Sequence, residues 1–199
     1  MGASLSWLAV RGRPAAEVLA DIHLHPTGVK GLDGESAYVG ATTDAGWYLI
    51  VARGAEHRLV SSAVLERLSA GCELLTCTVE EHVMFSQATG WRDGRRLWAV
   101  SHRGEDGPEG VEAEGALPPE YPLIRDRLVA QQKAAGGSEA EVDFLFDIPA
   151  SLAQWFVGYK HDEVNPAFEA RGFEVLEPER SEPAKQSWLG RLFGGRRDT

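Results

Sequence analysis

The stretch that decides the fold is CELLTCTVEEHVMFSQATGWRDGRRLWAVSHR, which runs from Cys72 to Arg103. Its Asp93-Gly94 pair is a strong signal for the tight turn of a β-hairpin. The residues on both sides are rich in Val, Thr, Phe and Trp, which favour an extended backbone. We therefore expect one long strand from Cys72 to Trp91 and an antiparallel partner from Arg96 to His102.

Alternation along this hairpin predicts which side chains share a face. With the loop centred on Asp93-Gly94, Phe85 faces His102 and Thr89 faces Trp98. The apolar side, expected to face the core, then carries Val79, Glu81, Val83, Phe85, Trp98, Val100 and His102. The more polar side carries Glu80, His82, Met84, Ser86, Leu97, Ala99, Ser101 and Arg103. A register shift of one residue would exchange the two sides.

Proline, glycine and apolar spacing divide the rest of the chain into short elements. We expect strands at 5–10, 47–51, 111–114, 144–146 and 173–176, a loop over most of 29–45, and helices that begin near Pro14, Ser61, Pro118 and Pro149. The last helix should bury Leu152, Trp155, Phe156 and Tyr159. Because βαβ units do not recur, the order favours an α+β fold, a mainly antiparallel sheet with about four helices packed on it.

The domain organisation follows from composition. Residues 1–176 form a single α+β domain, and 177–187, rich in Glu, Pro and Ser, predict a linker. Residues 188–199 form a basic amphipathic tail with the contact residues Trp188, Leu192, Phe193 and Arg191. The tail could dock in a partner groove or on an anionic membrane surface, or fold back loosely on the acidic body.

Charge limits the classes of partner. The chain carries 20 Lys and Arg against 30 Asp and Glu, for a net charge of −10. The tail is basic, so the body is more acidic than the whole. Such a body repels nucleic-acid phosphates and attracts a basic protein partner, although solubility alone also explains acidity.

Other sequence features predict no metal, cofactor or membrane span. Cys72 and Cys77 lie in an apolar stretch and are expected to be buried and reduced. No zinc-ligand spacing, phosphate loop or nucleophile elbow is present. No run of about 20 apolar residues occurs, so the expected location is the cytoplasm.

Three polar clusters are candidates for chemistry. Glu80, Glu81 and His82 could supply a general base, although on a strand only Glu80 and His82 share a side. His23 and His25 could bind a metal, or they could lie at a helix end. Lys160-His161-Asp162-Glu163, beside Trp155 and Tyr159, could anchor a partner or form a solvated helix end.

Several segments also carry a resemblance: Ser4–Val10, Gly46–Leu49, Leu68–Gly71, Val79–Ser86, Asp93–Val100 and Val142–Pro149. With these segments the chain resembles uncharacterised bacterial proteins with a domain of unknown function. That group implies no activity. Small acidic α+β proteins of this kind are loosely similar to bacterial immunity proteins, and this likeness implies a protein partner and assigns no residue a role.

Together these features favour a non-enzymatic, cytoplasmic bacterial binding protein, of the immunity or antitoxin type, that binds a basic partner through an acidic or polar surface. The partner-binding residues expected are Glu80, His82, Ser86, Ser101 and Arg103. The alternative is a small hydrolase or transferase with a catalytic site at Glu80 and His82. A third hypothesis is a peripheral protein held by its basic tail.

Overall fold

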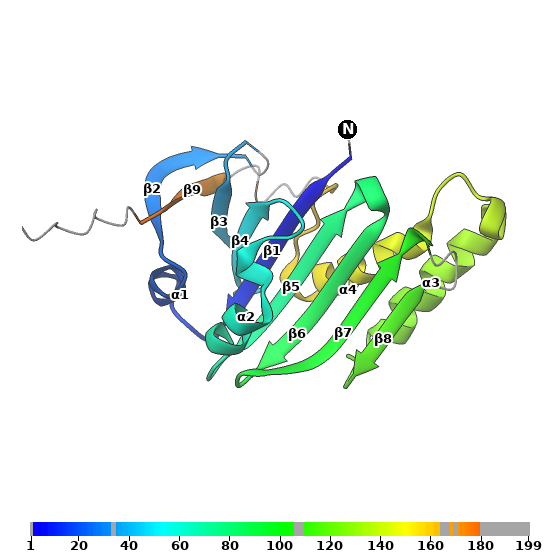
Figure 1. Ribbon diagram of the computed structural model, residues 1–199, viewed down its shortest axis with the longest axis horizontal. Coiled ribbons are helices and arrows are strands. Elements are labelled where there is room, and N and C mark those ends of the chain that lie inside the picture. The colour runs from blue at the N-terminus through cyan, green and yellow to red at the C-terminus, as the bar shows by residue number, and fades with distance from the viewer. Residues whose placement is uncertain (1, 33–34, 106–109, 164–167, 169–170, 180–199) are drawn as a thin grey trace, which may run out of the picture.

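A computed structural model describes residues 2–32, 35–105, 110–163, 168 and 171–179. Within these residues the strands form one sheet with antiparallel neighbours throughout, in the order β2-β9-β3-β4-β1-β5-β6-β7-β8 (Figure 1). The strands are β1 (Ser4–Arg11), β2 (Leu24–Gly31), β3 (Tyr38–Thr42), β4 (Tyr48–Arg53), β5 (Glu73–Glu80), β6 (Phe85–Arg92), β7 (Arg95–Arg103), β8 (Val111–Gly115) and β9 (Phe173–Pro178).

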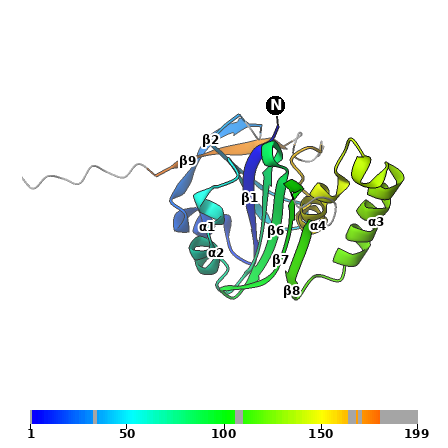
Figure 2. The same ribbon diagram turned by 45° about the vertical axis from the view of Figure 1, so that its right-hand side comes forward.

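The four α-helices whose bounds fall within the described residues lie in two layers on the two faces of this sheet (Figure 2). One layer holds α1 (Ala15–Asp21) and α2 (Ser62–Leu68), and the other holds α3 (Tyr121–Ala134) and α4 (Asp147–Val157). The prediction of an α+β fold with a mainly antiparallel sheet is therefore confirmed. No helix among the described residues is long and apolar enough to cross a membrane.

Each helical layer covers its own hydrophobic core. On the α1 and α2 side, Leu8, Ile50 and Leu74 pack against residues of both helices. On the α3 and α4 side, the core includes Trp7, Leu49, Leu75, Trp98, Val100, Ile124, Ile148 and Leu152. Strands β1 and β4 are buried on both faces, which explains why the sequence of β4 is apolar at successive positions.

The α1 and α2 layer covers only part of its face. The buried residues of its core come from β1, β2, β4, β5 and β9, and of the strands beyond β5 only Trp91 is packed against it. Figure 1 shows no helix in front of β6, β7 and β8. Within the described residues one face of this end of the sheet therefore has no helical cover, although its central side chains are less than 10% exposed.

The expectation of one strand from Cys72 to Trp91 is wrong. A 3-10 turn at Glu81–Val83 interrupts it, and Met84 follows in the left-handed region with φ of 51°. The stretch therefore folds into the separate strands β5 and β6, which pair with each other. The Asp93-Gly94 turn is confirmed: both residues have positive φ, as a type I′ turn requires.

A β-bulge shifts the predicted register by one residue. Trp91 pairs with Arg96 next to the turn, but Gly90 pairs with Trp98, so β7 holds one extra residue, Leu97. Beyond the bulge, Ser86 rather than Phe85 lies opposite His102. The placement of Ser86 on the exposed face is therefore wrong, because its side chain is fully buried in the α4 core.

Other local expectations also need correction. Phe144–Phe146 form a 3-10 turn instead of a strand, because the Asp143 side chain accepts hydrogen bonds from the Leu145 and Phe146 amides. Trp155 is 59% exposed on the outer side of α4. His25, expected at a helix end, lies in β2, and residues 38–42 of the expected loop form β3.

The predicted linker begins inside β9, which continues to Pro178. The rest of the linker from residue 180, and the tail residues Trp188, Arg191, Leu192 and Phe193, lie outside the described residues. Their proposed contacts stay predictions.

Candidate functional site

The open face of β5–β8 is the surface on which most of the predicted binding residues meet. Strand pairing places its side chains in rows across the four strands. We define the open face by the residues whose side chains lie on it: Thr76, Thr78, Glu80, Phe85, Gln87, Thr89, Ala99, Ser101, Arg103, Glu112 and Glu114. Two rows are Glu80–Phe85–Arg103 and Thr78–Gln87–Ser101–Glu112.

Short hydroxyl side chains occupy the middle of the open face, where Thr76, Thr78 and Thr89 are each less than 10% exposed. The Oγ1 atoms of Thr76 and Thr89 lie 2.7 Å apart, and Thr89 Oγ1 also accepts a hydrogen bond from Trp91 Nε1 at 2.8 Å. On the neighbouring strand β1, Ser6 Oγ lies 3.2 Å from Thr78 Oγ1. These hydroxyls satisfy one another, so the centre of the face is polar and held in place.

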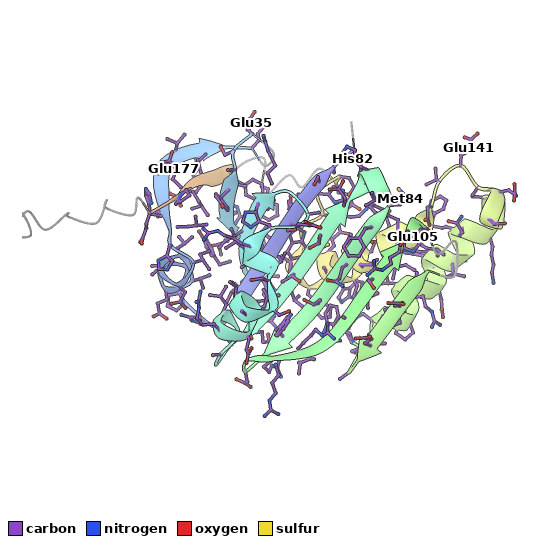
Figure 3. The ribbon with its side chains drawn as sticks, viewed as in Figure 1. Glu35, His82, Met84, Glu105, Glu141 and Glu177 are labelled. Carbon is purple, nitrogen blue, oxygen red and sulfur yellow. The ribbon has the colours of Figure 1, made fainter. Side chains whose placement is uncertain are left out.

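At one end, the open face sinks into a hollow of about 760 Å³. Its lining combines charge and apolar surface: Ser4, Ala55, Glu56, Thr78, Glu80, Val83, Phe85, Arg103 and Glu105. The Arg103 guanidinium lies over the Phe85 ring, 5.3 Å from its centroid. Figure 3 shows His82 and Met84 at the end of the β5–β6 hairpin and Glu105 near the end of β7.

Glu80 connects three elements at the edge of this hollow. Its Oε2 accepts a hydrogen bond from Ser4 Oγ at 2.5 Å, and its Oε1 lies 2.6 Å from His82 Nδ1. Oε1 also accepts from the His82 amide, so Glu80 caps the 3-10 turn. The hydrogen bonds from Ser4 and then from His82 lower the pKa of the Glu80 carboxyl.

This geometry weakens Glu80 as a general base, because a lowered pKa reduces its tendency to take a proton near neutral pH. The Ser4 hydroxyl donates to Glu80 and accepts from the Ala55 amide at 3.2 Å. Ser4, Glu80 and His82 do come together, but their hydrogen bonds hold β1, β5 and the turn in register. These three residues therefore form a rigid edge of the hollow.

The predicted binding residues therefore separate into three groups. Glu80 and Arg103 line the hollow, and Ser101 lies in the next row of the open face. His82 lies in the turn beyond β5, with 61% of its side chain exposed. Ser86 lies on the opposite face, where its Oγ donates to the Phe146 carbonyl at 2.6 Å.

The cluster Lys160–Glu163 adjoins the same end of the sheet. Lys160 is buried and lies 3.3 Å from Asp147 and 3.0 Å from Asp162. His161 Nε2 lies 3.4 Å from Glu81 Oε1, which joins this cluster to the 81–83 turn. Lys160 and His161 are thus packed residues, so the reading of a solvated helix end is wrong for both.

The remaining candidates stay apart. His23 follows α1 with φ of 56°, His25 lies in β2, and both are exposed. In the described parts of the chain no three His, Cys, Asp or Glu side chains group as a metal site requires. Cys72 and Cys77 are free and buried, and burial raises the pKa of Cys77 to about 12.

Two determinants of this site could not be predicted from the sequence pattern. The bulge at Leu97 and the left-handed Met84 together decide which side chains reach the open face. Gly104, after β7, was a usable signal, since a Cβ there would lie 2.6 Å from Met84 Cβ. A glycine at a strand end often marks such a close approach.

Comparisons of the chain with protein-family models, with curated proteins and with solved structures found no match. The assignment of function therefore depends on the geometry and charge of the open face.

Proposed function

We propose that the protein is a non-enzymatic, cytoplasmic binding protein of bacterial type, and that a basic protein docks on its open face. The observation that carries this proposal is that no helix of the described part of the chain covers the face that four neighbouring strands present. Hydrogen-bonded hydroxyls already satisfy the centre of that face, so it is a stable surface in the absence of a partner.

The charge of the open face supports a basic partner. Its rim carries the carboxylates of Glu56, Glu80, Glu105, Glu112 and Glu114. The described residues of β7 place the guanidinium groups of Arg96 and Arg103 on the same side, and Arg96 is already 3.0 Å from Glu114. An acidic surface of this kind steers a basic protein and speeds its association. An immunity protein that pairs with a basic toxin is the specific role that this surface suits best.

Charge reversal on the open face tests the proposal. We expect the wild-type protein to retain a basic protein from an extract of its source cells at a near-stoichiometric level. Glu112→Lys with Glu114→Lys should abolish this retention, and salt near 0.5 M should weaken it because surface charges are screened. Glu66→Lys with Glu139→Lys, at exposed positions elsewhere, is the matched control and should retain the partner. An unchanged capture by the open-face variant would reject the proposal.

A hydrolase or transferase is the second candidate, because Ser4 joins Glu80 and His82 in one hydrogen-bonded group. If this candidate is right, the purified protein should hydrolyse an activated ester. Ser4→Ala and His82→Ala should each lower the rate of that hydrolysis at least about 100-fold, as loss of an acid–base group does. Equal rates for the wild type and both variants would reject this candidate.

A further inference from the structure

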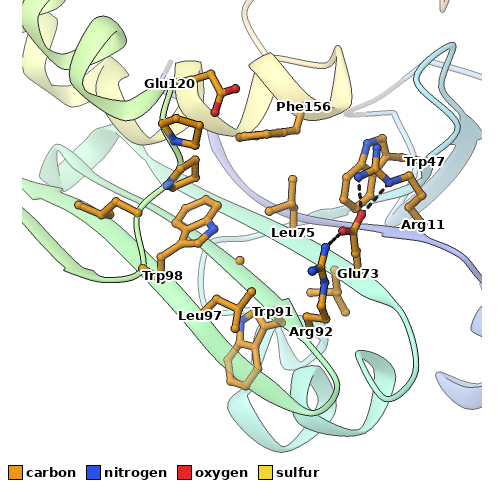
Figure 4. A pocket seen from close by; sticks show the side chains of 16 residues that line it. Arg11, Trp47, Glu73, Leu75, Trp91, Arg92, Leu97, Trp98, Glu120 and Phe156 are labelled. Atoms are coloured by element: carbon orange, nitrogen blue, oxygen red, sulfur yellow. Dashed lines mark hydrogen bonds and ion pairs between the residues drawn. The ribbon is translucent and has the colours of Figure 1, made fainter.

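A second pocket lies on the other face of the sheet and at the other end of β5. It has a volume of about 360 Å³, within the range of about 300–1,000 Å³ common for small-molecule sites. Strands β1, β5, β6 and β7 form its floor, and α4 and the segment between β8 and α3 form its walls. Figure 4 shows Trp98, Leu75 and Phe156 around its centre.

The walls of this pocket are apolar and partly aromatic. Trp98 is 6% exposed, and its indole lies flat over Gly90, where an added Cβ would be only 2.2 Å from Trp98 Nε1. Phe156 faces the pocket from α4, and Leu117 and Pro118 close it on the side of β8. An apolar or aromatic body in this pocket would lose part of its contact with water, which favours binding.

Glu120, which is partly exposed, lines the same pocket. Its Oε2 is buried, and no hydrogen-bond donor of the described residues reaches it. Figure 4 shows this carboxylate beside Phe156, across the pocket from the ion-pair cluster around Glu73. A buried carboxylate oxygen without a donor is costly, and a ligand cation at this position would remove that cost.

The far end of the pocket offers donors instead. Arg11 and Arg92 both pair with Glu73, so two positive charges share one negative charge. Trp47 contributes a buried Nε1 donor that meets no acceptor in the described part of the chain. The Arg11 guanidinium lies over the Trp47 ring, 4.5 Å from its centroid, and Trp91, Trp98 and Phe156 are the other aromatic residues that line the pocket.

We propose that this pocket binds an organic ammonium with an apolar, planar body. The ammonium pairs with the Glu120 carboxylate, and the body packs against Trp98 and Phe156. An aromatic wall beside a carboxylate favours such cations through both the ring quadrupole and the ion pair. The site is separate from the open face, so the inference goes beyond the proposed function and stands without it.

Three matched probes distinguish this chemistry from simple hydrophobic binding. Phenylpropylamine, phenylpropanol and phenylpropionate share one apolar body and differ in the terminal group. Titration calorimetry on the full chain should show saturable binding of the amine, with the alcohol about ten-fold weaker or more, since a charged hydrogen bond adds about 1.5–3 kcal/mol. The propionate should bind most weakly, because its carboxylate meets Glu120. Equal affinities for amine and alcohol, tighter binding of the propionate, or no saturable binding of the amine would overturn the proposal.

Glu120→Gln separates the role of the charge from the role of the fold. This variant keeps the size of the side chain, so the alcohol should bind as it does to the wild type, while the preference for the amine should disappear. Glu139→Gln, at an exposed position beyond the other end of α3, is the matched control and should keep the full preference. The amide region of a nitrogen-15 correlation spectrum checks that both variants are folded. A preference for the amine that survives Glu120→Gln would overturn the assignment of Glu120.

Discussion

Nε2 of His102, on β7, lies 2.7 Å from Oδ2 of Asp143, which begins the turn leading into α4. His102 is fully buried, and Asp143 Oδ1 accepts from the Leu145 amide at 3.0 Å. One carboxylate therefore holds the sheet and the start of α4 together. Because α4 covers β5, β6 and β7 on this face, the pair positions the layer opposite the open face.

Asp143→Ala should lower the free energy of unfolding by about 2–4 kcal/mol, because it removes a charged hydrogen bond to a buried imidazole and the cap of the turn. Urea denaturation measures the change. Asp126→Ala is the control: among the described residues this exposed carboxylate pairs only with the adjacent Arg125, so its loss should cost no more than about 1 kcal/mol. Equal losses for the two variants would contradict the structural role of Asp143.

Two serines test the register set by the bulge. Ser86 is fully buried and donates to the Phe146 carbonyl, so Ser86→Ala should cost about 1–3 kcal/mol of stability. Ser101 is also nearly buried, at 8% exposed, but its side chain makes no hydrogen bond within the described residues, so Ser101→Ala should cost only about 0.5 kcal/mol. The same denaturation measurement serves both variants. A larger loss for Ser101 than for Ser86 would restore the register expected from the turn alone.

Much of the fold could be predicted from local sequence. The Asp93-Gly94 turn, the helix starts after Pro14 and Pro118, and the buried strand β4 all follow from backbone preferences and apolar spacing that act within a few residues. These local signals agree with the tertiary structure, so the arrangement of sheet and helices could be predicted from the sequence.

The site was harder to predict from the sequence because it depends on single-residue irregularities of the backbone. One extra residue at Leu97 moves Phe85 and Ser86 each to the opposite face of the sheet from the one predicted. No local sequence preference indicates a bulge at that position. The turn at Glu81–Val83 requires a left-handed Met84, a conformation that is uncommon for a side chain of this kind. The 360 Å³ pocket joins residues from β1 through α4, and only tertiary packing brings them together.

Gly90 and Trp98 should be strongly coupled in a double-mutant cycle. Gly90→Ala places a Cβ against the Trp98 indole and should cost about 1–3 kcal/mol through overpacking. In a Trp98→Leu background the same substitution should cost much less, because the ring that blocks the Cβ is gone. Thermal or urea unfolding of the four proteins gives the coupling energy. A coupling energy near zero would show that the indole does not lie on Gly90.

The Lys160 cluster predicts how stability depends on pH. Burial alone would raise the pKa of Asp162, but its hydrogen bond to Lys160 and the Lys160 charge leave it lowered from the ordinary value of 3.8. A lowered folded-state pKa means that the ionised carboxylate stabilises the fold above the unfolded pKa and that this contribution is lost as the pH falls through the folded pKa. Asp162→Asn should therefore cost about 0.5–1 kcal/mol at pH 7, a modest value because Asp162 is partly exposed, and close to nothing at about pH 2–3. Urea denaturation at both pH values checks this, with Glu66→Gln as an exposed control that should show a small effect at each. A cost of Asp162→Asn that grows as the pH falls would contradict the stabilising pair with Lys160.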